Sequence, residues 1–328
     1  MEGGTEQSHW LDVVWLILVI VAAAAFVFSA SEQIESELQP GQQTPFNLPD
    51  ILLLGRLIAV ELMLFFVGCS ALLVYLFAPA AGIDLLPDSR PGSAGMTPDG
   101  RPQSPWSLWD VAKASAAAFL GSQVVLVVIM LVLSLDETSP ELVIINGFLV
   151  HAGMLILPVM FVRRRGGSLR QMGFTARRLV LNIAHGVGVY LATLPVFFTT
   201  AAVSAIVASR LNLSPQHPIV SILQEASDTW FVVAIVLLVT LVGPLTEEVL
   251  FRGFLYPAMR RRMSVAQAVF LNGFLFSLVH FSITGMLPYI VLGAALSLLF
   301  ERTRSLVSCN IFHVLHNTLA VIAMFEIM

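Results

Sequence analysis

The stretch TWFVVAIVLLVTLVGPLTEEVLFRG (229–253) decides the fold class, because an uncharged apolar run passes without a break into two carboxylates and an arginine. A helix of about 20 apolar residues spans the hydrocarbon core of a bilayer. Charged side chains at that depth cost roughly 2.5–3.5 kcal/mol each, so their presence points to a function. The stretch therefore predicts a membrane helix that carries Glu247, Glu248 and Arg252 for a chemical purpose.

The composition of the whole chain also indicates a membrane protein. Of 328 residues, 57% are hydrophobic and only 12% are charged, far from the balance of soluble domains. Runs long enough to cross a bilayer occupy 13–30, 57–80, 115–135, 142–162, 179–209, 229–251 and 305–325. The run from Met263 to Phe300 suits two helices separated at FSITGMLP (281–288). We expect an all-α polytopic membrane helix bundle with eight to nine transmembrane helices, nine being the direct count.

The chain is predicted to divide at about residue 140. Two stretches rich in Pro, Gly and Ser, 31–50 and 87–107, lie among the first three predicted helices. We interpret 1–140 as peripheral N-terminal transmembrane helices with these loops, and 141–328 as a compact transmembrane bundle. The unusual polar residues lie in the bundle.

Basic residues cluster in short turns of the bundle. The segment RRRGGSLRQMGFTARR (163–178) and the triplet RRR (260–262) contain no acid, while the intervening loops carry acids. By the positive-inside rule these turns are expected on the cytoplasmic side. Membrane lipids are the partners that this pattern predicts, and no nucleic-acid partner is expected.

The two carboxylates of the opening stretch are expected to face in different directions. At about 100° per residue, Arg252 lies about 40° from Glu248 and about 140° from Glu247. Glu248 and Arg252 can therefore pair at i, i+4, which leaves Glu247 without a partner on its own helix.

Two further polar pairs follow along the chain. Phe276 and His280 are four residues apart in FSLVH, and His313 and Asn317 are four residues apart in HVLHN. The basic turn 260–262 makes the helices before and after it antiparallel. With a rise of 1.5 Å per residue, Glu247 and His280 then lie about 21 and 28 Å from Arg261, at comparable depth.

Together these residues are the parts of a water-activating hydrolase. Glu247 would act as general base and share a water molecule with His280. His313 and Asn317 would offer N–H donors to the oxyanion that forms when water attacks a peptide carbonyl. Arg252 would hold Glu248 in place behind them.

A structural interpretation exists for each residue taken alone. The Glu248–Arg252 pair can act as a staple, and isolated polar residues in membrane helices usually bond to neighbouring helices. We assign that structural role to five residues: His151, His185, His316, Asn146 and Asn182.

The three motifs, E-E-x-x-x-R at 247–252, F-x-x-x-H at 276–280 and H-x-x-x-N at 313–317, resemble in type and order those of the CPBP family of intramembrane proteases. This family is also called the Abi or CAAX prenyl protease 2-like family. The resemblance covers roughly 140–328. It implies an endopeptidase in which Glu247 and His280 activate water, His313 and Asn317 stabilise the oxyanion, and Glu248, Arg252 and Phe276 support the site.

The resemblance leaves cofactor and substrate open. A mechanism without a metal is favoured, and zinc bound by Glu247, His280 and His313 is the alternative; the sequence lacks H-E-x-x-H. The implied substrate is a membrane-associated or lipidated, CAAX-like polypeptide, and the implied location is a bacterial inner membrane.

Two other functions fit the same residues. The chain could be a non-enzymatic membrane protein for bacteriocin immunity or scaffolding, or a proton-coupled transporter that uses Glu247 and His280 as a relay.

Overall fold

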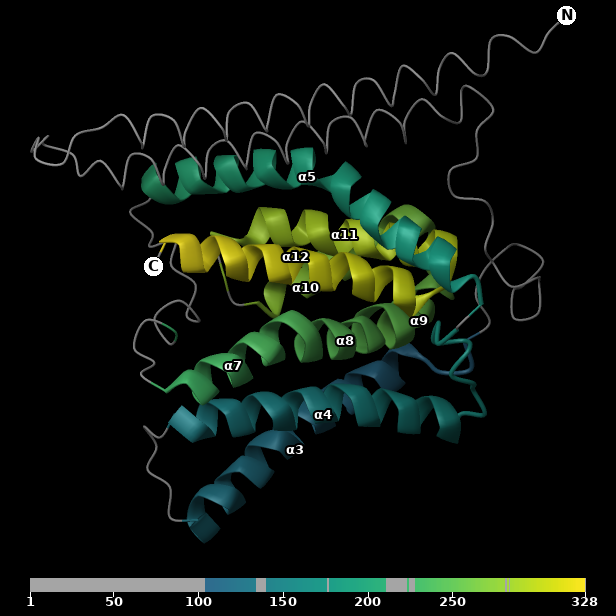
Figure 1. The fold of residues 1–328 in the computed structure, drawn as a ribbon. Coiled ribbons are helices and arrows are strands. Elements are labelled where there is room, and N and C mark those ends of the chain that lie inside the picture. Colours follow the sequence, from purple (N-terminus) through teal and green to yellow (C-terminus); the bar gives the residue numbers. More distant parts are fainter. Residues whose placement is uncertain are drawn as a thin grey trace, which may run out of the picture. The chain divides into compact units, whose positions relative to one another are not determined.

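The computed structural model describes residues 104–133, 140–175, 177–210, 223, 228–280, 282 and 284–327, and these are helical apart from short turns (Figure 1). The chain forms two compact units. One comprises residues 1–85, 191–198 and 327, and the other comprises 86–190, 199–326 and 328. All predicted site residues belong to the second unit. The predicted boundary at residue 140 stays a prediction.

Nine α-helical elements occur in the described residues, and no strand does. They are α3 (Leu108–Leu133), α4 (Pro140–Arg164), α5 (Leu179–Arg210), α7 (Thr229–Leu237), α8 (Gly243–Glu248), α9 (Tyr256–Arg260), α10 (Val265–Leu278), α11 (Met286–Thr303) and α12 (Leu306–Ile327). The elements α7 to α9 are parts of one continuous helix, 229–260.

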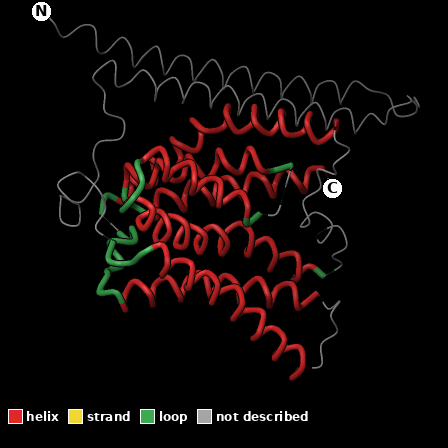
Figure 2. Tube along the Cα trace, turned by 180° about the vertical axis from the view of Figure 1, so that it is seen from behind, coloured by secondary structure: helices red, strands yellow, loops and turns green. Residues whose placement is uncertain are grey.

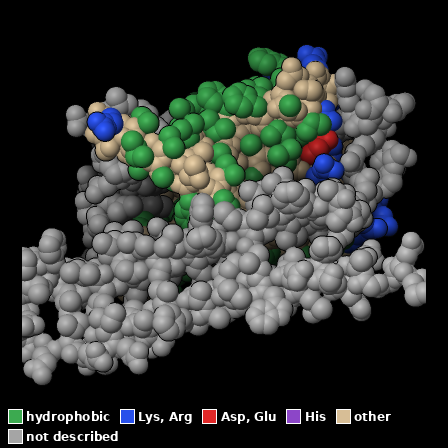
Figure 3. Space-filling view, turned by 90° about the horizontal axis from the view of Figure 1, so that it is seen from above, with side chains coloured by type: hydrophobic (Ala, Val, Ile, Leu, Met, Phe, Trp, Pro, Cys, Tyr) green, Lys and Arg blue, Asp and Glu red, His purple; other side chains and the backbone are tan. Residues whose placement is uncertain are grey.

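The predicted all-helical membrane fold is confirmed. Six described helices are long and apolar enough to cross a bilayer, and 265–278 is a shorter apolar helix. These correspond to seven of the nine predicted helices; the other two, 13–30 and 57–80, lie outside the described residues. Apolar side chains such as Leu131 and Val180 are exposed. Figure 3 shows hydrophobic side chains over much of the described part of one face. Such a surface suits contact with lipid chains.

The helix 229–260 differs from the straight α-helix predicted over 229–251. It continues nine residues further, and it contains the π-helical segments η2 (Leu238–Val242) and η3 (Val249–Leu255) on either side of the two glutamates. A proline follows each segment, Pro244 after η2 and Pro257 after η3. Because proline has no N–H and clashes with the preceding turn, it disturbs the regular hydrogen-bond ladder at both places.

Side chains from other parts of the chain bond to carbonyl groups of these irregular turns. Asn317 donates to the carbonyl of Val239 at 2.8 Å, and Asn272 donates to that of Phe251 at 3.1 Å. The indole N–H of Trp106 donates to the carbonyl of Phe254 at 2.8 Å. Since a polar group left unpaired away from water is costly, these donors stabilise the π segments and hence the direction of the glutamates.

The helices around this element approach closely. Helix α10 packs on α11, α3 packs on α4, and α4 packs on α8 and η3 (Figure 1). A Cβ on Gly293 would lie 2.8 Å from the Cα of Gly273. The backbones of α10 and α11 therefore touch at these two glycines, and the carbonyl of Gly293 is brought towards the site.

The arginine-rich turns lie at one end of the second unit, where Figure 2 shows the loops that join α4 to α5, α9 to α10 and α11 to α12. There Arg260 and Arg304 both bond to Glu301. Helix α10 begins with a capping box in which Ser264 and Gln267 bond to each other's backbone N–H. The cytoplasmic placement of this end stays a prediction.

Replacing Gly293 with Ala is expected to lower the thermal unfolding midpoint of the purified protein in detergent, because the new Cβ meets backbone atoms of α10. Gly121→Ala is the control: a Cβ there meets nothing within 4 Å, and Ala is favoured over Gly inside a helix by roughly 0.5–1 kcal/mol. Equal midpoints for the two variants would contradict the proposed close contact.

Candidate active site

Glu248 and Arg252 form a completely buried ion pair. Both side chains have 0% exposure, and Nη1 of Arg252 lies 2.8 Å from Oε1 of Glu248. This is the predicted i, i+4 pair, although π-helical segment η3 begins between the two residues. Nη2 of Arg252 also donates to the carbonyl of Gly293 at 3.0 Å. Buried charges need such partners, because desolvation otherwise costs several kcal/mol for each ion.

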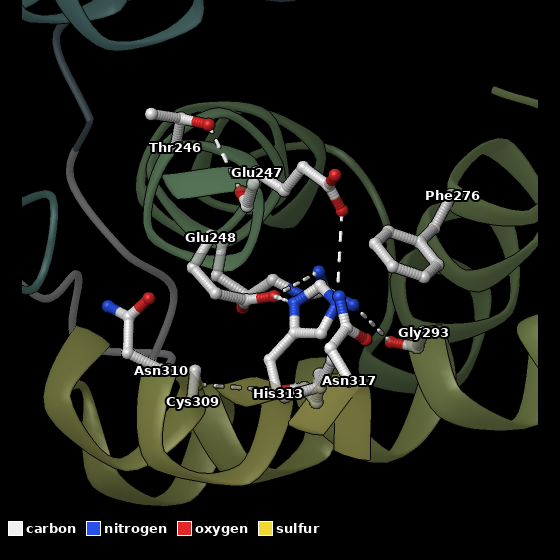
Figure 4. A network of polar contacts seen from close by, with 12 residues as sticks. Thr246, Glu247, Glu248, Phe276, Gly293, Cys309, Asn310, His313 and Asn317 are labelled. Carbon is white, nitrogen blue, oxygen red and sulfur yellow. Dashed lines mark hydrogen bonds and ion pairs between the residues drawn. The ribbon is translucent and has the colours of Figure 1, made fainter. Parts of the chain in front are cut away.

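His313 extends this pair to a third group. Its Nδ1 lies 2.8 Å from the same Oε1 of Glu248, and its side chain has 1% exposure. A carboxylate that is already paired with Arg252 accepts hydrogen bonds, so Nδ1 of His313 is the donor. The bond directs Nε2 of His313 towards Glu247, as Figure 4 shows for these labelled residues.

Phe276 packs against three polar side chains of the site, one guanidinium and two imidazoles. Its ring lies 4.7 Å from the guanidinium carbon of Arg252, and its centroid lies 4.6 Å from that of His280 and 5.6 Å from that of His313. The side chain is fully buried. Phe276 therefore fixes the mutual positions of these residues and attracts the Arg252 cation through its ring face.

His280 lies beyond the end of α10, in a turn, and not on a continuing helix as the spacing suggested. The capping residue after α10 is Val279. Nδ1 of His280 lies 2.7 Å from the carbonyl oxygen of Phe276. A carbonyl only accepts, so Nδ1 carries the hydrogen, and in the neutral ring Nε2 presents a lone pair. Tyr289 of α11 covers another side of the ring, with centroids 4.6 Å apart.

Glu247 faces both histidines. Its Oε2 lies 3.9 Å from Nε2 of His280 and 3.8 Å from Nε2 of His313. Oε2 is buried and forms no direct hydrogen bond with the described residues. These separations are too long for direct hydrogen bonds and are of the size that a bridging water can span. The arrangement offers a carboxylate oxygen and two imidazole nitrogens to a single small molecule.

Asn317 lies one turn after His313 on α12, but its amide is partly engaged. One N–H bonds to the carbonyl of Val239. A side-chain amide has two N–H groups, so one donor remains for a ligand. Asn317 therefore holds η2 as well as belonging to the candidate site.

The residues predicted to be structural have varied surroundings. Asn146 accepts a hydrogen bond from Gln123 of α3 at 3.0 Å, and Asn182 donates to the carbonyl of Arg177 at 3.0 Å. His185 is buried in α5. His316 is buried beside Tyr190, with ring centroids 6.1 Å apart.

His151 lies closer to the site than the sequence indicated. Its Nδ1 is 2.7 Å from Oγ1 of Thr246, the residue that precedes Glu247. A Cβ on Gly243 would lie 3.5 Å from Oε1 of Glu247 and 3.6 Å from Cε1 of His151. Both groups therefore border the same small space. Asn272 and Tyr289 were also missed, since no spacing pattern links them to the three motifs.

The three potential zinc ligands are spread wider than a zinc site. Ligands about 2.0–2.2 Å from a tetrahedral zinc ion are roughly 3.3–3.6 Å apart, and the Glu247 oxygen is 3.8 and 3.9 Å from the imidazole nitrogens. Within the described residues, no group of three or more His, Cys, Asp or Glu side chains is arranged to hold a metal ion.

Comparisons with known proteins agree with the motifs. Residues 229–319, which contain all three, match the model of the family described as type II CAAX prenyl endopeptidase Rce1-like. A curated protein of Bacillus subtilis (strain 168), named "Putative membrane peptidase YdiL", is 28% identical over 87 residues, which are 26% of this chain. The chain thus covers 36% of that relative's length. No solved structure matches the chain significantly. Over 229–319, this match agrees with the family resemblance that the motifs indicate.

Arg252→Ala is expected to destabilise the protein by about 3–5 kcal/mol, because it leaves the charge of Glu248 buried with one partner fewer. The free energy of unfolding in detergent is the measurement. Arg262→Ala, at an exposed position on the basic turn, is the control and should change stability little. A loss for Arg252→Ala as small as that of the control would show that the ion pair contributes no net stability.

Proposed function

We propose that the chain is an intramembrane endopeptidase that hydrolyses a peptide bond of a membrane-associated or lipidated polypeptide. The observation that carries this proposal is the position of Oε2 of Glu247, 3.9 and 3.8 Å from two imidazole nitrogens. The family match over the same residues supports it.

Glu247 and His280 activate the attacking water in this proposal. The water donates one hydrogen bond to Oε2 of Glu247 and one to Nε2 of His280, whose hydrogen is held on Nδ1 by the carbonyl of Phe276. As the water oxygen attacks the peptide carbon, its proton passes to Glu247. Both acceptors are fixed beforehand, which lowers the cost of ordering the water in the transition state.

His313 and Asn317 stabilise the oxyanion. Nδ1 of His313 donates to Glu248, and in the imidazolium form of the ring Nε2 carries a second N–H that can donate to the oxyanion. Asn317 supplies its second amide N–H. Glu248 and Arg252 act through His313 by holding its orientation. Donors fixed in a site that excludes water stabilise a developing negative charge more strongly than donors in solvent.

The substrate is proposed to be a polypeptide at the membrane. Glu247, His313 and Asn317 lie within helices that are long and apolar enough to cross a bilayer, so a substrate held at the membrane by a lipid or an apolar segment reaches them most readily. The matched family is described as CAAX prenyl endopeptidases, which favours a lipidated, CAAX-like substrate. A bacterial inner membrane is the proposed location, since the curated relative is from Bacillus subtilis.

Glu247→Gln and His280→Ala are each expected to lower hydrolysis by about 10²–10⁴-fold, as for loss of a general base or its partner, without unfolding the protein. The measurement compares the membrane proteins of two cell lines, one with the wild type and one with Glu247→Gln. C-terminal fragments present only with the wild type identify the substrate. Glu326→Gln, an exposed carboxylate near the end of α12, is the control and should cleave like wild type.

Normal cleavage by Glu247→Gln would refute the assignment of the base. Proton-coupled transport in liposomes that Glu247→Gln abolishes, with no peptide cleavage, would instead support the transporter. A protective phenotype that survives Glu247→Gln would support immunity or scaffolding.

Hydrolysis without a metal is the second part of the proposal. A purified enzyme treated with a chelator and then freed of it should cleave the identified substrate at an unchanged rate. Loss of activity that zinc alone restores would overturn this part. It would assign Glu247, His280 and His313 as ligands that move closer to one another when zinc binds. Metal content measured on the same sample is the control.

A further inference from the structure

The two oxygens of Glu247 have different surroundings. Oε2 is buried beside His280 and His313. The side chain as a whole keeps 17% exposure, and Oε1 lies on a different side of the carboxylate from the two imidazoles. That side borders Gly243, which has no side chain, and beyond the glycine lies Cε1 of His151. Glu247 thus has histidines on both sides, two at Oε2 and one near Oε1.

Thr246 fixes the His151 ring in one orientation. The Thr246 hydroxyl donates to the carbonyls of Val242 and Gly243, at 2.9 and 3.0 Å. Its oxygen therefore accepts the hydrogen of Nδ1 of His151 at 2.7 Å. Nε2 of His151 is left without a described partner on a ring that is only partly buried, so it is accessible to a ligand.

We propose that His151 is a further catalytic residue, the general acid that protonates the leaving amine. This inference rests on the proposed endopeptidase function. The attacking water and the oxyanion donors occupy the Oε2 side of Glu247, so the leaving nitrogen has room on the Gly243 side. Any side chain at residue 243 would fill the space between Glu247 and His151.

The protons balance over the hydrolysis as a whole. When water attacks, one proton passes to Glu247. When the C–N bond breaks, its electron pair goes to nitrogen, which takes a proton from Nε2 of the doubly protonated His151. Glu247 then returns its proton to Nε2 of His151. The net reaction places OH on the acyl group and H on the amine, and both residues regain their starting states.

The test compares two leaving groups in the full-length enzyme. The probes are the peptide that spans the cleavage site found in the membrane comparison and its depsipeptide, in which an ester replaces the scissile amide. His151→Gln keeps an N–H that can donate to Thr246 but cannot transfer a proton. We expect kcat for the peptide to fall about 10²-fold or more with KM unchanged, and kcat for the ester to fall less than about 10-fold, because an alkoxide leaves with less help.

The pH profile gives a second readout. A general acid must be protonated, so the peptide rate of the wild type declines as pH rises through its titration, and His151→Gln should lack this alkaline decline. Asn146→Ala, on the same helix and bonded to α3, is the control for a general disturbance of α4 and should preserve both the peptide rate and its profile.

Each contrary result has a distinct meaning. Equal losses for peptide and ester, or an unchanged alkaline decline, would show that His151 only holds α4 against Thr246 and would overturn the inference. Equal losses in Asn146→Ala would do the same. Failure of the proposed function appears differently. Absence of fragments in the membrane comparison would refute the endopeptidase, and normal cleavage of both probes by Glu247→Gln would refute the assignment of its base; the inference fails with either.

Discussion

The structure depends on keeping one carboxylate charged where water does not reach it. Glu248 has 0% exposure, and an ion so placed is tolerated only with partners that replace its hydration. Arg252 and His313 supply them through a single oxygen. Arg252 is held in turn by the carbonyl of Gly293 and the ring of Phe276. Four segments of the chain are thereby tied to one charge, and the orientation of His313 towards Glu247 is a consequence of it.

Glu247, the residue before Glu248, has a carboxylate oxygen without a direct partner among the described residues. Oε1 of Glu248 is in direct contact with Arg252 and His313. Oε2 of Glu247, in contrast, lies too far from the two imidazoles for a direct hydrogen bond. The rigid network around Glu248 maintains this gap. A carboxylate exposed to solvent would be free to move and close this gap. On the other side of the gap, the aromatic rings of Phe276 and Tyr289 confine His280. Stability at residue 248 and reactivity at residue 247 therefore arise from the same packing.

Much of this arrangement could be predicted from the sequence, because it follows from spacing. The i, i+4 rule gave the Glu248–Arg252 pair, and the basic turn 260–262 gave antiparallel helices with Glu247 and His280 at one depth. A break near 281–288 was rightly predicted, although it comes earlier, because α10 ends at Leu278 and α11 already begins at Met286. These predictions need only helical geometry and polarity. The roles of the site residues go beyond geometry, and they stay predictions that the proposed experiments address.

The remaining features depend on contacts between distant segments, which spacing does not encode. His151 contacts Thr246 across 95 residues, so no spacing pattern distinguishes it from His185. The helix geometry around the glutamates was also missed, although Pro244 and Pro257 were visible signals of irregularity. Asn317 illustrates why prediction stops there: its position was found from a motif, but its bond to Val239 exists only because the opposite helix is π-wound.

The two π-helical segments also constrain how this chain can change during evolution. Each occupies a fixed length on one side of the glutamates, and a donor from another part of the chain meets a specific carbonyl in each. Deleting one residue from 238–255 would rotate everything beyond it by about 100° and would bring the wrong carbonyl to each asparagine. Homologous chains should therefore tolerate substitutions in this helix far better than insertions or deletions, and should accept changes of length in their loops.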